Sequence, residues 1–369
     1  MTAPAENGAS LPDPRRYPQD GRHPLLELAA ASGKDAERAL VQAMSDLLSR
    51  GADGEARRAL SLAPDRQAYA RLWRALCAAS EGAGCPHEPV VANVFAMPLV
   101  IVTGAREAAS APGVLSDVAA LADVLQRAGA LGEGRNFGLG NALCSLDALQ
   151  QLPPSTILKW RVPDSARPGP REIPPEPIAI RPGEEVHVRF LLGAAVAPAA
   201  APGVAETASH IGSWGMRFAR TLGSQLAVPG VELLAFPRPP MGVLKAAYHG
   251  RRAQLDVALN LFLSNAIKRM RAAAGEPTLV LSVHRCGTNG AELRASMSAV
   301  LDETLLEGFR WPLHPLDDPD EIAASVGQFA ADCRLTDVRV VESVLPEGGV
   351  RRGAMFVRAG EAPEARLRY

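Results

Sequence analysis

The strongest constraint on the fold lies between residues 278 and 300, where apolar and polar residues alternate on both sides of a turn signal. Alternation from Thr278 to His284 is the period-two pattern of a strand with one buried face. Asn289-Gly290 supplies residues that tolerate the positive φ angles of a type I′ turn. Alternation resumes from Ala291 to Ala299. The segment therefore predicts a β-hairpin whose second strand is half-exposed.

Helical periodicity is clearest between Val243 and Ala274, where apolar residues share one face and basic residues share the other. Pro240 precedes this segment, and Gly275 and Pro277 follow it, so the helix is bounded at both ends. We expect further helices at residues 24–48 (with a break at 32–33), 65–80, 113–128, 142–152, 205–226 and 317–333. We expect further strands at residues 90–96, 99–103, 185–192, 231–236, 338–345 and 354–357, the last two joined as a second hairpin.

The order of these elements predicts an α/β or α+β fold. A helical N-terminal region contains a short buried strand pair, and a mixed-sheet C-terminal region follows in the order β-α-β-α-ββ-α-ββ. Prolines suggest the domain limits. We expect a flexible arm at residues 1–22, a mainly helical domain at 23–152, a proline-rich linker at 153–183 and a mixed α/β domain at 184–369.

Composition narrows the class of protein. The 369 residues are 47% hydrophobic and carry a formal net charge of −1, which gives a sizeable core but no long-range attraction to nucleic acid. We therefore expect no nucleic-acid partner. Lysine accounts for only four of the 39 basic residues, a bias that we interpret as that of a GC-rich bacterial genome.

Cysteine usage and hydropathy suggest a location. The five cysteines are scattered along the chain, unlike a disulfide framework, and indicate reduced thiols. The longest apolar stretch, Val90 to Val102, is shorter than the roughly 20 residues that span a bilayer. The N-terminus has no apolar core typical of a signal peptide. We expect a cytoplasmic protein with no membrane insertion.

The tripeptide His284-Arg285-Cys286 carries the most reactive residue types. Residues two apart on a strand point to the same face, so His284 and Cys286 could form a base and thiol nucleophile. Arg285 or His187 would assist. The alternative is that these side chains only pack across the hairpin.

A glycine-rich segment before the helix expected at 142–152 is the second candidate. Free N–H groups at a helix start can hold an anion, and Arg135, Asn136, Gly138 and Gly140 would form such an anion site. The alternative is a plain connecting loop, because glycine clusters mark turns more often than phosphate sites.

No cofactor motif is present, and we expect neither a cofactor nor a metal. Cys85 and His87 are close in sequence, but a structural zinc site needs a second such cluster.

Two functions remain open. The first is a non-enzymatic protein-interaction, assembly or structural component of a bacterial cytosolic or phage-like complex, with a protein partner or self-association. It rests on the lack of catalytic motifs and on alanine-rich helices that offer packing surfaces. The second is an enzyme with a Cys/His site in the C-terminal domain, built on His284 and Cys286.

Overall fold

A computed structural model describes residues 23–82, 90–132, 136–161, 173–198, 211–286, 290–299 and 306–344. The chain forms two compact units, Met1–Pro86 and His87–Tyr369. The arm predicted at residues 1–22 lies outside the described residues. No helix in the described ranges combines the length and the apolar character that a membrane crossing requires.

The first unit is helical. Its helices are α1 (Pro24–Ala30), α2 (Lys34–Ser49), α3 (Asp53–Ser61) and α4 (Arg66–Ser80). Gly33, with a φ of 106°, separates α1 from α2 as the sequence predicts. The Asp65 carboxylate accepts the Ala68 N–H at 2.8 Å and caps α4, as Ser, Thr, Asp and Asn do at helix starts. Helix α3 was not predicted.

A four-stranded sheet, here the first sheet, opens the second unit with strand order β3-β5-β1-β6. Its strands are β1 (Val90–Ala105), β3 (Asn136–Ser145), β5 (Gly183–Pro198) and β6 (Val231–Pro237), and all neighbours run antiparallel. Strands β2 (Ala109–Ala111) and β4 (Ile178–Ile180) form a separate two-stranded sheet. Along the chain, β2 follows β1 and β4 precedes β5.

Strand β1 corrects the prediction of two short strands that meet at Pro98. It is continuous because the lost N–H of Pro98 interrupts no pairing with β5. Within a strand, the N–H and C=O of one residue point to the same side. The Pro98 carbonyl accepts the Arg238 N–H at 2.8 Å, so the missing N–H faces the β6 side, beyond the last β6 pair, Leu99–Pro237.

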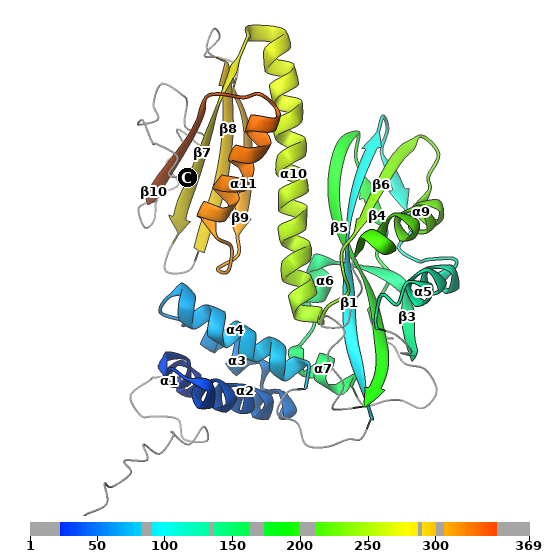
Figure 1. Cartoon of the computed structure of the whole chain (residues 1–369), viewed down its shortest axis with the longest axis vertical. Helices are drawn as coiled ribbons and strands as arrows, with labels where there is room; N and C mark the ends of the chain where they lie inside the picture. Colours follow the sequence, from blue (N-terminus) through cyan, green and yellow to red (C-terminus); the bar gives the residue numbers. More distant parts are fainter. Residues whose placement is uncertain are drawn as a thin grey trace, which may run out of the picture. The chain divides into compact units, whose positions relative to one another are not determined.

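Helices cover both faces of the first sheet (Figure 1). Helices α5 (Val118–Arg127) and α9 (Gly215–Leu226) bury apolar side chains against one face. Helix α6 (Leu146–Gln151), helix α7 (Pro154–Lys159) and the start of α10 (Val243–Ala274) bury theirs against the other. A 3-10 turn, η1 (Ile211–Ser213), precedes α9. The helices predicted at 113–128 and 205–226 are therefore shorter than expected.

The second sheet has strand order β10-β7-β8-β9. Its strands are β7 (Pro277–Cys286), β8 (Gly290–Ala299), β9 (Leu306–Leu313) and β10 (Val338–Val344). Helices α10 and α11 (Pro319–Asp332) cover one face with a single apolar core. Strand β9 was not predicted. Strand β10 runs parallel to β7, and the partner predicted for it at 354–357 lies outside the described residues.

The predicted hairpin is confirmed as β7 and β8, which pair antiparallel from Pro277–Ala299 to Cys286–Gly290. Because Gly290 already pairs with Cys286, it belongs to the strand and not to a two-residue type I′ turn. Residues 287–289 join the strands and lie outside the described residues. The half-exposed second strand is also a wrong prediction, since every residue from Leu293 to Ala299 is buried.

Helix α10 has the bounds that the sequence predicts. Its first part packs on the first sheet, where Val243, Ala246 and Ala247 are buried. Its later part packs on the second sheet through Leu255, Leu259, Leu263 and Met270. A helix with apolar residues on more than one side is typically buried between other elements, and α10 thus serves two cores.

The architecture confirms the α+β class, with a helical N-terminal region and a sheet-rich C-terminal region. The units divide at Pro86, however, and not at the proline-rich stretch. Strand β1 pairs over its whole length with β5, so strands on both sides of residues 153–183 share one sheet. That stretch therefore lies inside the second unit, and its residues 162–172 are outside the described ranges.

Candidate functional site

Three features of the second unit could carry function: a polar cluster on β5, a polar cluster on the second sheet, and an apolar edge on β6. Each is built by the alternation of side chains along a strand. The strand places every second side chain on one face, so residues of one type gather where the sequence repeats every two positions.

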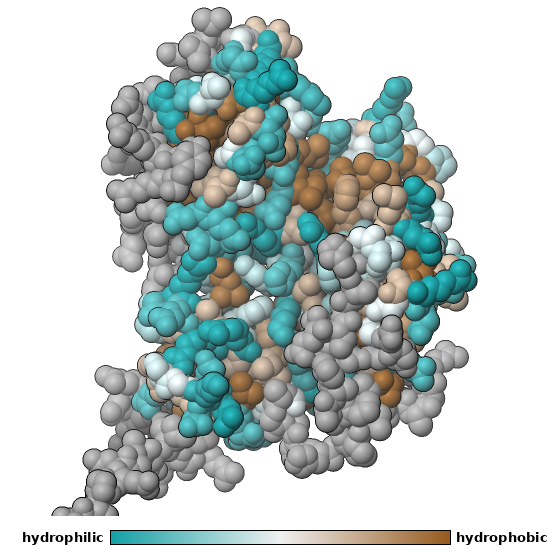
Figure 2. Space-filling view, in the orientation of Figure 1, coloured by the Kyte–Doolittle hydropathy of each residue, from teal (hydrophilic) through white to brown (hydrophobic). Residues whose placement is uncertain are grey.

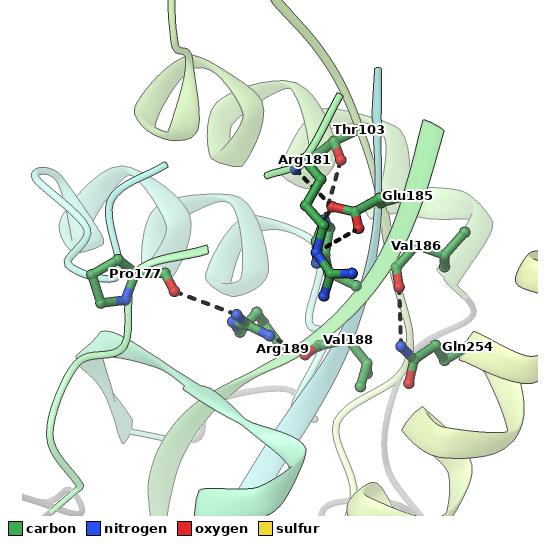
Figure 3. Close-up of polar contacts among 9 residues, drawn as sticks. Thr103, Pro177, Arg181, Glu185, Val186, Val188, Arg189 and Gln254 are labelled. Atoms are coloured by element: carbon green, nitrogen blue, oxygen red, sulfur yellow. Dashed lines mark hydrogen bonds and ion pairs between the residues drawn. The ribbon is translucent and has the colours of Figure 1, made fainter. Parts of the chain in front are cut away.

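The polar cluster on β5 consists of Glu185, His187 and Arg189, which alternate along the strand and so share one face, with Thr103 of β1 and Arg181 before β5. Figure 3 labels Glu185, Arg189, Thr103 and Arg181. The Thr103 hydroxyl and His187 Nε2 lie 3.1 Å apart. His187 Nε2 also lies 3.7 Å from the Glu185 carboxylate. The same carboxylate accepts the Arg181 N–H at 2.9 Å across the turn before β5.

A hydroxyl, an imidazole and a carboxylate are the parts of a nucleophilic triad, and the geometry tests that possibility. In a triad the imidazole uses one nitrogen toward the hydroxyl and the other toward the carboxylate. Here Nε2 of His187 faces both Thr103 and Glu185. Thr103 is also 0% exposed, so its oxygen cannot reach a substrate. The contact between Thr103 and His187 therefore joins β1 to β5 and is not part of a nucleophilic triad.

Burial is the main reason why the His187 ring is neutral at physiological pH. Burial lowers the pKa of His187, Glu185 raises it, and Arg189 and Arg181 lower it. Burial also lowers the pKa of Arg189, whose guanidinium donates to the carbonyls of Val188 at 2.9 Å and Pro177 at 3.5 Å (Figure 3). These carbonyls engage Nη1 and Nη2, whereas the buried Nε has no hydrogen-bond partner among the described residues.

The second sheet buries the predicted catalytic histidine. His284 is 6% exposed, and its Nε2 lies 2.9 Å from the Ser282 hydroxyl on the same strand. Across the pair, Arg294 donates to the Glu292 carboxylate at 2.6 Å. Burial and then Arg294 lower the pKa of His284, whereas Glu292 raises it. The neutral ring has the protonation state of a general base, but it is enclosed.

Cys286 follows His284 by two positions in β7, and its backbone pairs with Gly290. Its side chain lies outside the described part of the chain. The predicted pairing of this thiol with His284 therefore stays a prediction.

The predicted anion site has a different backbone from the one expected. Asn136, Gly138 and Gly140 lie within β3 and not in a loop before a helix. Asn136 and Gly138 pair with Val196 and Ala194 of β5. Pairing with β5 uses the main-chain groups of Asn136 and Gly138, whereas Gly140 lies where this pairing is irregular, between Leu139 and Leu143. The anion site stays a prediction. Arg135 lies outside the described residues, as do Cys85 and His87.

A third group of titratable side chains joins α10 to the loop before α11. The His314 N–H donates to the Asp317 carboxylate at 2.7 Å, and His314 Nδ1 accepts the Leu316 N–H at 3.2 Å. Burial raises the pKa of Tyr248 to about 12, and the neighbouring Asp317 carboxylate adds to it. Burial lowers the pKa of His314 to about 4. At neutral pH both side chains are uncharged, which suits a packed joint.

The described residues contain no group of three His, Cys, Asp or Glu side chains that could hold a metal ion. Cys144, on β3, is buried, and its thiol donates to the Phe190 carbonyl at 3.2 Å. Burial raises its pKa to about 12, so this thiol stays protonated and unreactive.

The apolar edge is the last feature. In the described part of the first sheet, β6 is an edge strand. Its side chains alternate: Leu233 and Ala235 pack toward α9, while Leu234 and Phe236 are 63% and 46% exposed. Figure 2 shows apolar residues gathered over the part of the first sheet where β6 lies. The sequence predicts this strand but not its place at the edge.

Among the described residues, neither polar cluster has an open reacting group, and the apolar edge is the feature best suited to binding. Comparison with protein-family models, with curated proteins and with solved structures found no match to this chain.

Proposed function

We propose that the protein is a non-enzymatic interaction protein, an assembly or structural component of a bacterial cytosolic or phage-like complex. It binds protein through the edge of β6. The observation that carries this proposal is the open main chain of β6 beside two exposed apolar side chains, Leu234 and Phe236.

The open main-chain groups follow from the hydrogen bonds of β1. Its even-numbered residues face away from β5: the Ala92 N–H reaches the Arg161 carbonyl, and Ala96 exchanges hydrogen bonds with Met241. The even-numbered residues of β1 therefore make the hydrogen bonds to β6, at the pairs Val100–Phe236 and Val102–Leu234.

The odd-numbered residues of β6 consequently turn their N–H and C=O groups outward. For Leu233 and Ala235 no partner of these groups occurs among the described residues. An edge of this kind is a template for another strand, and proteins usually guard it with lysine, proline or a bulge. Between Val231 and Phe236 the only charged residue is Glu232, and the one proline of β6 is its last residue, Pro237.

Side chains beside the edge add apolar area. Covering a leucine or phenylalanine side chain removes it from water and stabilises a complex by about 1.5–3 kcal/mol if burial is complete. Leu234 and Phe236 are adjacent on one face, next to half-buried Val102. Main-chain hydrogen bonds and a row of alternate side chains are what strand addition uses for affinity and specificity.

The alternative function, an enzyme that uses His284 and Cys286, has less support. His284 is buried and its Nε2 is engaged with Ser282. The hydroxyl of Thr103, which bonds half-buried His187, is enclosed as well.

The test is the native mass of the full chain in extracts of its source cell. We expect a mass well above the 38.9 kDa of one chain, and loss of that larger species in the variant Leu234→Lys. Arg217→Glu, which changes an exposed residue of α9 outside the β6 strand, is the control and should leave the mass unchanged. A wild-type protein that runs as a single chain, or a complex indifferent to Leu234→Lys, would contradict the proposal.

A further inference from the structure

The exposed face of β6 carries an acidic residue at one end, a basic residue at the other end and two apolar residues between them. This order complements itself when two such strands run antiparallel. Glu232, Leu234, Phe236 and Arg238 follow one another at every second position, and all four are exposed. Arg238 continues the ladder beyond β6, since its N–H donates to the Pro98 carbonyl at 2.8 Å. The order is acid, apolar, apolar, base.

We propose that this edge binds a second copy of the chain, with the two β6 strands antiparallel and Ala235 opposite its counterpart on a twofold axis. The inference rests on the proposed function and names its partner. Two four-stranded sheets then form one continuous sheet across the dimer. A twofold interface requires a surface that complements itself, and the pattern of β6 has that property.

The side chains select the register. With Ala235 on the axis, Glu232 lies opposite Arg238 of the second copy, and Leu234 lies opposite its Phe236. Opposite charges and apolar pairs facing each other across strands are both favourable. A shift by two residues puts Leu234 on the axis and sets the Glu232 carboxylate against the Phe236 ring, which removes the direct ion pair.

The main chain fits the same register. The outward N–H and C=O of Ala235 bond those of the second Ala235. The outward N–H of Leu233 lies opposite Pro237 of the other copy, a residue that is buried in its own chain. Pro237 has no N–H to return, and proline cannot extend a ladder further. Pro237, Pro239 and Pro240 therefore limit the pairing to the centre of the strand, where Leu234 and Phe236 are exposed.

The charges at the two ends of the exposed face, Glu232 and Arg238, indicate which partner binds this edge. An unrelated extended segment would satisfy the main chain equally well, but it would need its own base and acid at matching positions. The second copy brings both residues in the required order at the same spacing. The pairing brings four exposed apolar side chains next to one another, Leu234 and Phe236 of each copy.

The experiment is a charge swap on the purified full chain, measured by analytical ultracentrifugation with circular dichroism to confirm folding. Glu232→Arg sets two arginines opposite each other at both ends of the interface, and Arg238→Glu sets two glutamates there. Each variant alone should raise the dissociation constant by about tenfold or more. The control Arg217→Glu changes an exposed charge on α9 and should leave the constant unchanged.

Mixing the two charge variants is the decisive experiment. When Glu232→Arg and Arg238→Glu are combined in equal amounts, every facing pair is again acid with base, so heterodimers should form with near wild-type affinity. The double variant in one chain should likewise recover self-association. Recovery excludes misfolding as the cause of the loss in the single variants.

Several outcomes would overturn the inference. One is wild-type protein that remains a single chain up to about 0.1 mM, and another is a dimer that none of the charge changes weakens. Single variants that weaken it without recovery on mixing would contradict the register. If the purified chain is monomeric while the Leu234-dependent complex persists in cell extracts, self-pairing fails and the proposed function stands.

Discussion

The imidazole of His187 on β5 lies 3.1 Å from the hydroxyl of Thr103 on β1. The two residues are separated by 84 positions in the sequence, and each belongs to a strand of the first sheet. Thr103 is fully buried. A buried hydroxyl and a largely buried imidazole each lose hydration on folding, and their shared hydrogen bond offsets that loss.

Replacing this hydroxyl tests whether the pair is structural. We expect Thr103→Val, which keeps the branched shape, to lower the free energy of unfolding by about 1–2 kcal/mol because His187 loses its partner. Urea denaturation measures the change. Thr221→Val on α9 is the matched control: its hydroxyl donates to the Arg217 carbonyl at an exposed site, and its loss should cost less than about 0.5 kcal/mol. Equal effects for the two variants would refute the assignment.

Acid should destabilise the protein through His314. Burial lowers the pKa of His314 from 6.5 to about 4 in the folded chain. Between those values the unfolded chain binds more protons, so stability is complete above pH 6.5 and is lost as the pH falls toward 4. The full shift corresponds to about 3 kcal/mol. Because the ring is only partly enclosed, we expect about 2 kcal/mol.

The variant His314→Asn isolates that contribution. Its amide oxygen can accept the Leu316 N–H that His314 Nδ1 accepts at 3.2 Å, and it does not titrate. We expect the variant to lose less stability than the wild type on acidification, in urea denaturation series at pH 7 and pH 4.5. Parallel pH profiles for the two proteins would show that His314 is not the group responsible.

Elements with local signals could be predicted from the sequence. Helix α10 has the predicted bounds because Gly275 and Pro277 mark its end without reference to other residues. The β7–β8 hairpin follows from alternation within each strand. The capping of α4 by Asp65 is also a local interaction. In each case neighbouring residues decide the structure.

Elements that depend on pairing between distant segments could not be predicted from the sequence. Strand β3 contains Gly138 and Gly140, which do not favour strands, and its pairing with β5 supplies the structure. Pro98 breaks a strand only when its missing N–H faces a partner, which depends on where β6 ends. The exposure of Leu234 and Phe236 depends on strand order. His187 was named only as an assisting residue, and its contact with Thr103 spans two strands.

Close packing between α10 and the first sheet makes Gly250 sensitive to substitution. A Cβ at this position would lie 2.6 Å from the Phe190 ring and 3.2 Å from the Pro98 Cβ. We expect Gly250→Ala to lower the free energy of unfolding by about 1–3 kcal/mol, since inserted volume displaces a packed ring. Gly223→Ala on α9 is the matched control because its added Cβ meets nothing within 4 Å. There the gain in helix propensity should stabilise by up to about 1 kcal/mol. Thermal unfolding would reveal opposite signs for the two variants, and a neutral Gly250→Ala would contradict the tight contact.

Thiol reactivity separates the proposed function from the enzyme alternative. A catalytic thiol is ionised near neutral pH and alkylates rapidly. Cys144 is buried with a pKa of about 12 and should be the slowest to react, while the partly exposed Cys333 serves as an internal reference. If the protein is an interaction component, Cys286 reacts with iodoacetamide at pH 7 no faster than Cys333, as mass spectrometry of peptides can measure. Cys286→Ser should then leave the native mass in cell extracts unchanged. Preferential labelling of Cys286 would instead favour an enzyme, because an assembly role gives no reason for an activated thiol beside His284.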